Sequence, residues 1–218
     1  MFGQNSSIRA EPSDGKKTKK IVFQWAFCTL RKTDADQKPR VVGRKTTMNS
    51  GDQFKFFVKP QSTCYLYLIH HNSQHQLKIL YPLMFNPAVS QNTGSGEQYI
   101  PDGDQWFELD ENTGQEKFYL LASIQPLSDL EKLIEQYEGA DKVNQSGLVD
   151  QIITEIRDLR KRHLKFKTYS EKPVTSISKQ RRGKQSVRVL TKDIAHYAVE
   201  ISTTTFFSRT YTIDHREE

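Results

Sequence analysis

The fold is decided by three stretches of sequence, which read GDQFKFFVKP at residues 51–60, TCYLYLIHHNSQHQLKILYP at 63–82 and GEQYIPDGDQWFELDENTGQEKFYLLAS at 96–123. In each stretch apolar and polar residues alternate, and Gly, Asn, Asp or Pro separate the alternating runs. This pattern is typical of short antiparallel strands that are half buried against a core. We therefore expect a mainly β protein.

Residues 63–71 are the clearest central strand. Both of its faces are apolar, since Tyr65, Tyr67 and Ile69 alternate with Cys64, Leu66 and Leu68. A strand that is apolar on both faces is expected to be buried between two layers. The turn HNSQHQ then leads to a hairpin partner at residues 77–81.

Other segments extend the β pattern in both directions. Residues 21–30 form a first strand, and residues 41–48 are expected to form a short edge strand. Two strands close the chain, around residues 197–201 and 207–213, and we expect them to return to the sheet that the first strand begins.

The period of the pattern changes from two to about 3.6 after Pro126. Ser128 and Glu131 have the spacing of a capping box, and Gly139 ends this first helix. A second helix is expected after residues 144–147, with an apolar stripe that includes Leu148, Ile152, Ile156 and Leu159.

Two helices placed late among strands do not fit a parallel α/β fold, in which helices alternate with strands throughout. The sequence instead predicts one domain over residues 21–218. We expect an immunoglobulin-like antiparallel β-sandwich with an inserted helical hairpin at about residues 127–165.

Length and composition set outer limits. The chain has 218 residues and a formal net charge of +6, and it contains no apolar run of the roughly 20 residues that a membrane helix needs. Residues 1–20 are polar and lysine-rich, so we interpret them as a flexible basic leader. They lack the apolar core of an export signal, which fits either cytoplasmic residence or a signal that has been removed.

Two cysteines do not make a disulfide framework. Cys28 and Cys64 both lie inside strand patterns. Small buried thiols are the simpler interpretation, and a disulfide between two packed strands is the alternative.

Positive charge is concentrated between residues 157 and 188, where twelve basic residues accompany only Asp158 and Glu171. The part at about residues 168–188 has little apolar content and is expected to be a mobile basic loop. Clustered cations attract polyanions, nucleic acid or an anionic surface. The candidate binding residues are Arg157, Arg160, Lys161, Arg162, Lys165, Lys167, Lys179, Arg181, Arg182 and Lys184.

Catalytic patterns are weak. The histidines at 70, 71 and 75 are the most tempting group for a metal, but neighbouring strand residues point to opposite faces of a sheet. Asp102-Gly103-Asp104 is only a fragment of a calcium loop. No phosphate loop, nucleophile elbow or zinc-protease motif occurs. We therefore predict no enzymatic activity, no metal and no cofactor.

A family resemblance covers roughly residues 40–125. Its elements are Gly51-Asp52, the strand at 65–69, Ile79 to Pro82, Tyr99 to Pro101, and Gly114-Gln115-Glu116 followed by 118–122. In order and spacing they resemble the bacterial domain of unknown function 4384. Tyr81 and Cys64 depart from the residues that are common in that family, which are phenylalanine and glycine.

The resemblance implies a β-sandwich with no known reaction, in proteins that are secreted or associated with the bacterial envelope. From it we expect a non-catalytic protein-interaction or scaffolding module, periplasmic or secreted, with a protein partner and no small-molecule substrate. Binding of a polyanion or nucleic acid through residues 157–188 is the alternative, and cytoplasmic residence is not excluded by the sequence. Aromatic side chains for base stacking are sparse in that segment, which argues against sequence-specific reading of nucleic acid.

Overall fold

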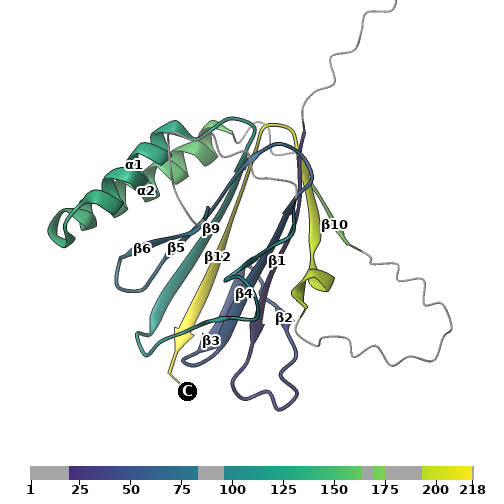
Figure 1. Cartoon of the computed structure of the whole chain (residues 1–218). Helices are drawn as coiled ribbons and strands as arrows, with labels where there is room; N and C mark the ends of the chain where they lie inside the picture. The colour runs from purple at the N-terminus through teal and green to yellow at the C-terminus, as the bar shows by residue number, and fades with distance from the viewer. Residues whose placement is uncertain (1–19, 83–95, 164–168, 175–192, 218) are drawn as a thin grey trace, which may run out of the picture.

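The computed structural model describes residues 20–82, 96–163, 169–174 and 193–217. Strands form two sheets that face each other, and a helical hairpin covers the outer surface of one of them (Figure 1). The mainly β, sandwich-like architecture that the sequence predicts is confirmed.

The first sheet has seven strands and begins with the first strand of the chain. Its main path runs β10-β11-β1-β4-β7, while β2 pairs with β1 and β8 pairs with β4. These strands are β1 (Ile21–Leu30), β2 (Arg40–Val41), β4 (Gln53–Pro60), β7 (Gln98–Ile100), β8 (Phe107–Glu108), β10 (Tyr169–Pro173) and β11 (Val199–Thr203). A short 3-10 helix, η2 (Ile194–Tyr197), lies against the outer face of β1 and β4.

The second sheet has five strands in the order β3-β12-β9-β5-β6. Its members are β3 (Lys45–Asn49), β5 (Tyr65–His71), β6 (Leu77–Tyr81), β9 (Gly114–Ser123) and β12 (Phe206–Arg216). The predicted hairpin of β5 and β6 is present. All pairs are antiparallel except β3 with β12, which run parallel.

Two strand predictions differ from the structure. The segment predicted as one edge strand at 41–48 divides between the sheets, because the chain crosses from β2 to β3. Of the closing strands, β11 returns to β1 as expected, but β12 joins the other sheet beside β9. A two-residue period identifies strands without saying which sheet they join.

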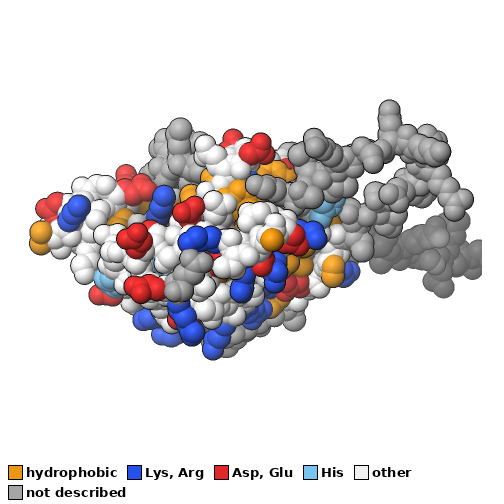
Figure 2. Space-filling model, turned by 90° about the horizontal axis from the view of Figure 1, so that it is seen from below, with side chains coloured by type: hydrophobic (Ala, Val, Ile, Leu, Met, Phe, Trp, Pro, Cys, Tyr) orange, Lys and Arg blue, Asp and Glu red, His pale blue; other side chains and the backbone are white. Residues whose placement is uncertain are grey.

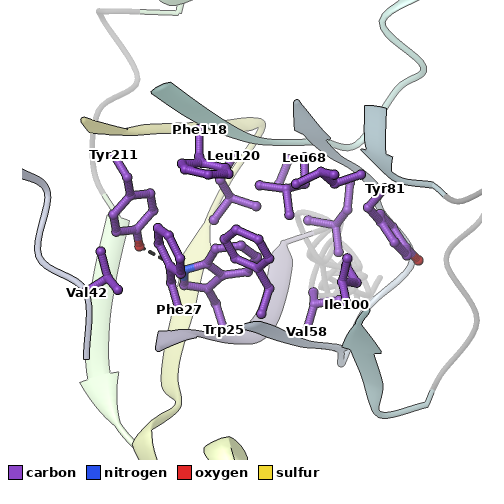
Figure 3. Close-up of a cluster of buried hydrophobic side chains, with 14 of the residues drawn as sticks. Trp25, Phe27, Val42, Val58, Leu68, Tyr81, Ile100, Phe118, Leu120 and Tyr211 are labelled. Carbon is purple, nitrogen blue, oxygen red and sulfur yellow. Dashed lines mark hydrogen bonds between the residues drawn. The ribbon is translucent and has the colours of Figure 1, made fainter. Parts of the chain in front are cut away.

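The core between the sheets is filled by aromatic rings. Trp25 and Phe27 of β1 pack against Phe118 of β9 and Tyr211 of β12, and Trp25 Nε1 donates to the Tyr211 hydroxyl at 2.8 Å (Figure 3). β5 serves two layers, as its apolar faces predict. Leu66 and Leu68 face this core, while its other face lies under the helices.

The helical hairpin consists of α1 (Ser128–Gly139) and α2 (Lys142–Arg162). The predicted capping box at the start of α1 does not form, since no side chain caps that end and Glu131 accepts the Tyr67 hydroxyl at 2.5 Å instead. α2 begins earlier than predicted, because Asp141 accepts the backbone N–H of Asn144 and caps it.

Tyr137 joins α1 to the edge of the second sheet. Its hydroxyl accepts the backbone N–H of Leu77 at 3.0 Å and donates to the Leu77 carbonyl at 3.1 Å. The helix therefore occupies backbone groups of the edge strand β6 that would otherwise face outward.

Candidate functional site

The predicted basic residues fall in two groups. Arg157, Arg160, Lys161 and Arg162 lie in the last turns of α2. The other six lie outside the described residues, and they are Lys165, Lys167, Lys179, Arg181, Arg182 and Lys184. The first residues of the predicted loop at 168–188 also differ from expectation, because residues 169–173 form β10 and pair with β11.

The end of α2 is positioned by its buried face. Val149, Ile152, Ile156 and Leu159 pack onto the second sheet with α1. Basic residues in the last turn suit the negative end of the helix dipole. This packing places the end of α2 beside the beginning of β12.

The basic side chains of α2 do not form one continuous surface. Lys161 pairs with Asp158 at 3.0 Å, and Arg162 pairs with Glu155. At the opposite end of the sandwich, which Figure 2 shows from below, Lys and Arg side chains are likewise interspersed with Asp and Glu. Exposed pairs of this kind leave little net field for a polyanion.

Arg160 turns toward the sheet instead. Its Nε donates to Ser208 Oγ at 2.7 Å, and its Nη2 donates to Thr210 Oγ1 at 2.6 Å. Partial burial lowers the pKa of Arg160. Within the described ranges Arg160 forms no ion pair with a carboxylate.

A pocket of about 480 Å³ opens at this point, and we call it the arginine pocket. It lies where β12 has no β3 beside it, since β3 pairs only with Thr212 to Arg216. Its lining comes from the end of α2 and the residue that follows it, the start of β12, the end of β11, β10 and the segment before β3. The lining residues are Arg44, Arg160, His163, Tyr169, Thr203, Phe206, Phe207, Ser208, Arg209 and Thr210.

Two further guanidinium groups are fixed around the arginine pocket. Arg209 is only 6% exposed and forms a two-pronged ion pair with Glu171 of β10. Burial works against its charge, but the bonds to Glu171 outweigh burial and raise the pKa of Arg209. Arg44 donates to the Tyr169 hydroxyl at 2.8 Å. Burial opposes ionisation of Tyr169, yet the hydrogen bond from Arg44 and the positive charge of Arg209 nearby lower its pKa overall.

His163 follows α2 and closes one side of the pocket. Its ring stacks on Phe206 with centroids 4.5 Å apart. Partial burial and the nearby Arg162 lower the pKa of His163, which keeps the imidazole neutral at neutral pH. The buried Nδ1 of His163 and Nε of Arg209 have no hydrogen-bond partner among the described residues. Buried polar atoms without partners are rare and often mark a site for water or an ion.

A second polar cluster lies at the other end of β12, and we call it the Glu116 cluster. Glu116 is 4% exposed, and its carboxylate contacts His70 Nε2 at 2.5 Å and the backbone N–H of Ser73 at 3.1 Å. Burial raises its pKa, but these bonds outweigh burial and lower it overall. His215 lies 4.0 Å from Glu116 and 3.0 Å from Ser50 Oγ.

Ser50, His215 and Glu116 have the residue types of a hydrolase triad but not its geometry. A triad needs the acid to bind and orient the imidazole. Here the His215 Nδ1 lacks a hydrogen bond, and Glu116 is bonded to His70. His215 is also only 2% exposed, so we interpret the cluster as a structural connection between loops.

The remaining predicted candidates do not converge on a metal. His71 contacts His75 at 3.2 Å, and His75 lies 3.4 Å from Asp150 of α2. Across the described ranges, no three His, Cys, Asp or Glu side chains are grouped to hold a metal ion. None of the helices in those ranges is long and apolar enough to cross a membrane.

The cysteines are both buried thiols, and the described structure contains no disulfide between them. Cys28 faces outward from β1 under η2, whereas Cys64 lies in the core between the sheets. Burial raises the pKa of Cys28 to about 12, so its thiol is a poor nucleophile at neutral pH.

The motif residues of the family resemblance serve turns near the Glu116 cluster. Asp52 accepts the backbone N–H groups of Lys32 at 2.9 Å and of Asn49 at 3.0 Å. Gly114 has φ +134°, and a Cβ there would lie 2.7 Å from the Ser73 side chain. A conformation and a contact of this kind require glycine.

Comparison with known proteins agrees with these motifs. Residues 47–126 match the family described as Domain of unknown function (DUF4384). The resemblance found in the sequence is thereby confirmed over that range. No curated protein and no solved structure matches the chain. The DUF4384 match begins after Arg44 and ends before α1, so every lining residue of the arginine pocket lies outside it.

Sequence reasoning identified Arg160 but missed most of its neighbours. Arg44, Tyr169 and Arg209 come from segments far apart in the chain, and only the folded sheet brings them together. One signal was present for Arg209. It alternates with Phe207, Tyr211 and Ile213 on a face that is otherwise apolar, and a charged residue in such a position is rarely buried without a partner.

Proposed function

We propose that this domain is a non-catalytic protein-interaction module that binds an acidic partner protein through the arginine pocket. The observation that carries the proposal is Arg160, which is half-buried and held by two hydroxyl groups, with no carboxylate paired to it in the described structure. A fixed, partly desolvated guanidinium group is well prepared to bind an anion because its ordering cost is already met.

The alternative of a general polyanion or nucleic-acid binder has less support. It requires clustered cations with little compensating negative charge. Two of the four predicted cations on α2 are engaged by neighbouring acids, and Arg160 is directed into a pocket too local for a polymer backbone.

The proposal is tested with a fluorescent Glu-rich peptide, whose binding is followed by anisotropy at about 0.15 M salt. We expect the double change Arg44→Gln and Arg160→Gln to weaken binding about tenfold or more, because each removes a charge-assisted contact. Arg157→Gln is the matched control, since Arg157 is exposed on the same helix and does not line the pocket.

Equal peptide binding by the double variant and the parent protein would reject this function. An oligonucleotide of the same charge serves as the second probe. If it binds more tightly than the peptide and loses affinity steeply with salt, the polyanion alternative replaces the proposal.

We also propose, on the strength of the family resemblance, that the module works in the periplasm or outside the cell. The immunoglobulin-like topology of the sandwich stays a prediction as well. Location is tested by fusing the natural gene product to alkaline phosphatase, which is active only after export. A full-length fusion without phosphatase activity would contradict an envelope location.

A further inference from the structure

We propose that the arginine pocket binds the phosphoryl group of a phosphate monoester carried by a phosphorylated side chain of the partner. This inference rests on the proposed function and narrows it from acidic proteins in general to phosphorylated ones. Four properties of the pocket support it: unused donors, their directions, the local charge and the shape of the lining.

The first property is the presence of unused hydrogen-bonding atoms. Arg160 uses its Nε and one Nη2 position, and its Nη1 forms no bond among the described residues. The buried His163 Nδ1 also lacks a partner there. A bound oxyanion would supply the acceptor that Arg160 needs, and a protonated phosphate oxygen or the other imidazole tautomer would satisfy His163. Arg209 is not one of these donors, because it points to the other face of β12 and both of its Nη atoms bind Glu171.

The second property is the number of directions from which donors approach. Arg44 precedes β3, Arg160 comes from α2, and Ser208 and Thr210 come from β12. The two hydroxyl groups accept from Arg160, so their own protons remain available to a ligand. A planar carboxylate is satisfied by one guanidinium fork, whereas a tetrahedral phosphoryl group has oxygens for donors on several sides.

The third property is charge. Three guanidinium groups, those of Arg44, Arg160 and Arg209, are set against the single carboxylate of Glu171, which leaves a surplus of two positive charges. A phosphate monoester carries close to two negative charges at neutral pH. A carboxylate would neutralise only half of that surplus.

The fourth property is the lining. The pocket holds about 480 Å³, which is more than a free phosphate ion needs. The stacked rings of His163 and Phe206 and the edge-to-face pair of Tyr169 and Phe207 provide apolar walls. An organic group attached to the phosphate therefore has a surface to contact.

A phosphorylated protein fits the surroundings better than a phospholipid bilayer does. Binding to a bilayer surface requires several uncompensated basic residues or an exposed apolar face. Beside the pocket, Lys161 and Arg162 are paired with acids, and α1 carries the exposed residues Asp129, Glu135 and Glu138.

The experiment measures binding of phenyl phosphate, benzoate and a short phosphoserine peptide by isothermal titration calorimetry on the whole chain. We expect phenyl phosphate to bind about tenfold or more tightly than benzoate. Arg160→Gln should weaken phenyl phosphate binding by about tenfold or more, and Arg160→Lys should recover only part of it, because lysine keeps the charge but loses the fork. Arg157→Gln should change affinity by less than about twofold.

The outcomes separate this inference from the proposed function. If the Glu-rich peptide binds through Arg160 but phenyl phosphate binds no better than benzoate, phosphoryl recognition is rejected and the interaction module stands. If the protein sediments with phosphatidic acid vesicles in an Arg160-dependent way but does not bind the phosphoserine peptide, the protein partner is rejected in favour of a lipid. Circular dichroism of each variant shows that a loss of binding is not a loss of folding.

Discussion

The Glu116 cluster and the arginine pocket lie at opposite ends of β12, and they differ in how their charges are balanced. In the Glu116 cluster, a buried carboxylate is bonded to a histidine and a backbone N–H of the same chain. In the arginine pocket, positive charge exceeds negative charge, and no carboxylate of the described residues pairs with Arg160. A polar group that is matched internally stabilises a fold, while a surplus that stays open is available to a ligand.

The largest loss of stability is expected from Glu116→Gln. The change removes the charge that binds His70 and the Ser73 N–H, and it leaves buried donors poorly matched. We expect the free energy of unfolding to fall by about 3 kcal/mol, as for other broken buried pairs. Urea denaturation measures it, and the exposed Glu111→Gln should change it by less than about 0.5 kcal/mol. Equal values for the two variants would remove the structural role of the Glu116 cluster.

The second largest loss of stability is expected from Gly114→Ala. A side chain there would combine an unfavourable positive φ with a contact 2.7 Å from the Ser73 Cβ. We expect a loss of about 2 kcal/mol in the free energy of unfolding, again measured in urea. Gly139→Ala is the control, because no atom lies within 4 Å of an added Cβ there. A cost at Gly139 as large as that at Gly114 would contradict this explanation.

Lowering the pH is expected to reduce the free energy of unfolding through His71, which lies at the same end of the molecule as the Glu116 cluster. The pKa of His71 is lowered from its ordinary value of 6.5 to about 4 in the folded protein. Burial is the main cause, and the charge of His75 is the second. Between these two pH values the unfolded chain binds more protons, so stability falls as pH falls. We expect a loss of about 1 kcal/mol after allowance for the partial exposure of the ring.

Urea midpoints recorded between pH 7 and pH 4 measure this effect. The variant His71→Gln should lose about 1 kcal/mol less over that range than the parent protein. His196→Gln, at an exposed histidine, is the comparison variant. If the stability of the His71→Gln variant falls with pH as steeply as that of the parent protein, the acid sensitivity comes from other groups.

The smallest effect on stability is expected at the arginine pocket. Arg160→Gln removes a partly desolvated cation that no carboxylate of the described structure balances, and it costs two bonds to hydroxyl groups. These contributions oppose each other, so the free energy of unfolding should stay within about 1 kcal/mol of the parent value. A loss as large as that of Glu116→Gln would make the two ends alike and remove the argument for a binding role.

The two-residue period of the sequence was sufficient to predict that strands pack in layers, but not to predict which sheet each strand joins. The double apolar face of residues 65–69 correctly placed that strand between two layers. Residues 41–48 gave no sign that the chain crosses between sheets, because a short strand looks the same in either sheet. β10 was missed since YSEKP is exposed throughout, and its position depends on pairing with β11 and on the Glu171–Arg209 contact.

The candidate site was predictable only in part. A local excess of basic residues directed attention to Arg160, but it gave equal weight to Lys161 and Arg162, which pair with acids on their own helix. Distinguishing them requires the rotation of α2 about its axis, and packing of the buried stripe sets that rotation. Arg44 and Arg209 belong to segments separated by more than a hundred residues, so no local pattern connects them.

The position of β12 has a consequence for how the chain is synthesised. This strand is the last to leave the ribosome among those described, yet it lies between β3 and β9 and completes the second sheet. Until residues 206–216 have emerged, β3 has no neighbour and the rings of Trp25 and Phe27 are without one wall. The nascent chain therefore cannot complete its second sheet before residues 206–216 have been translated.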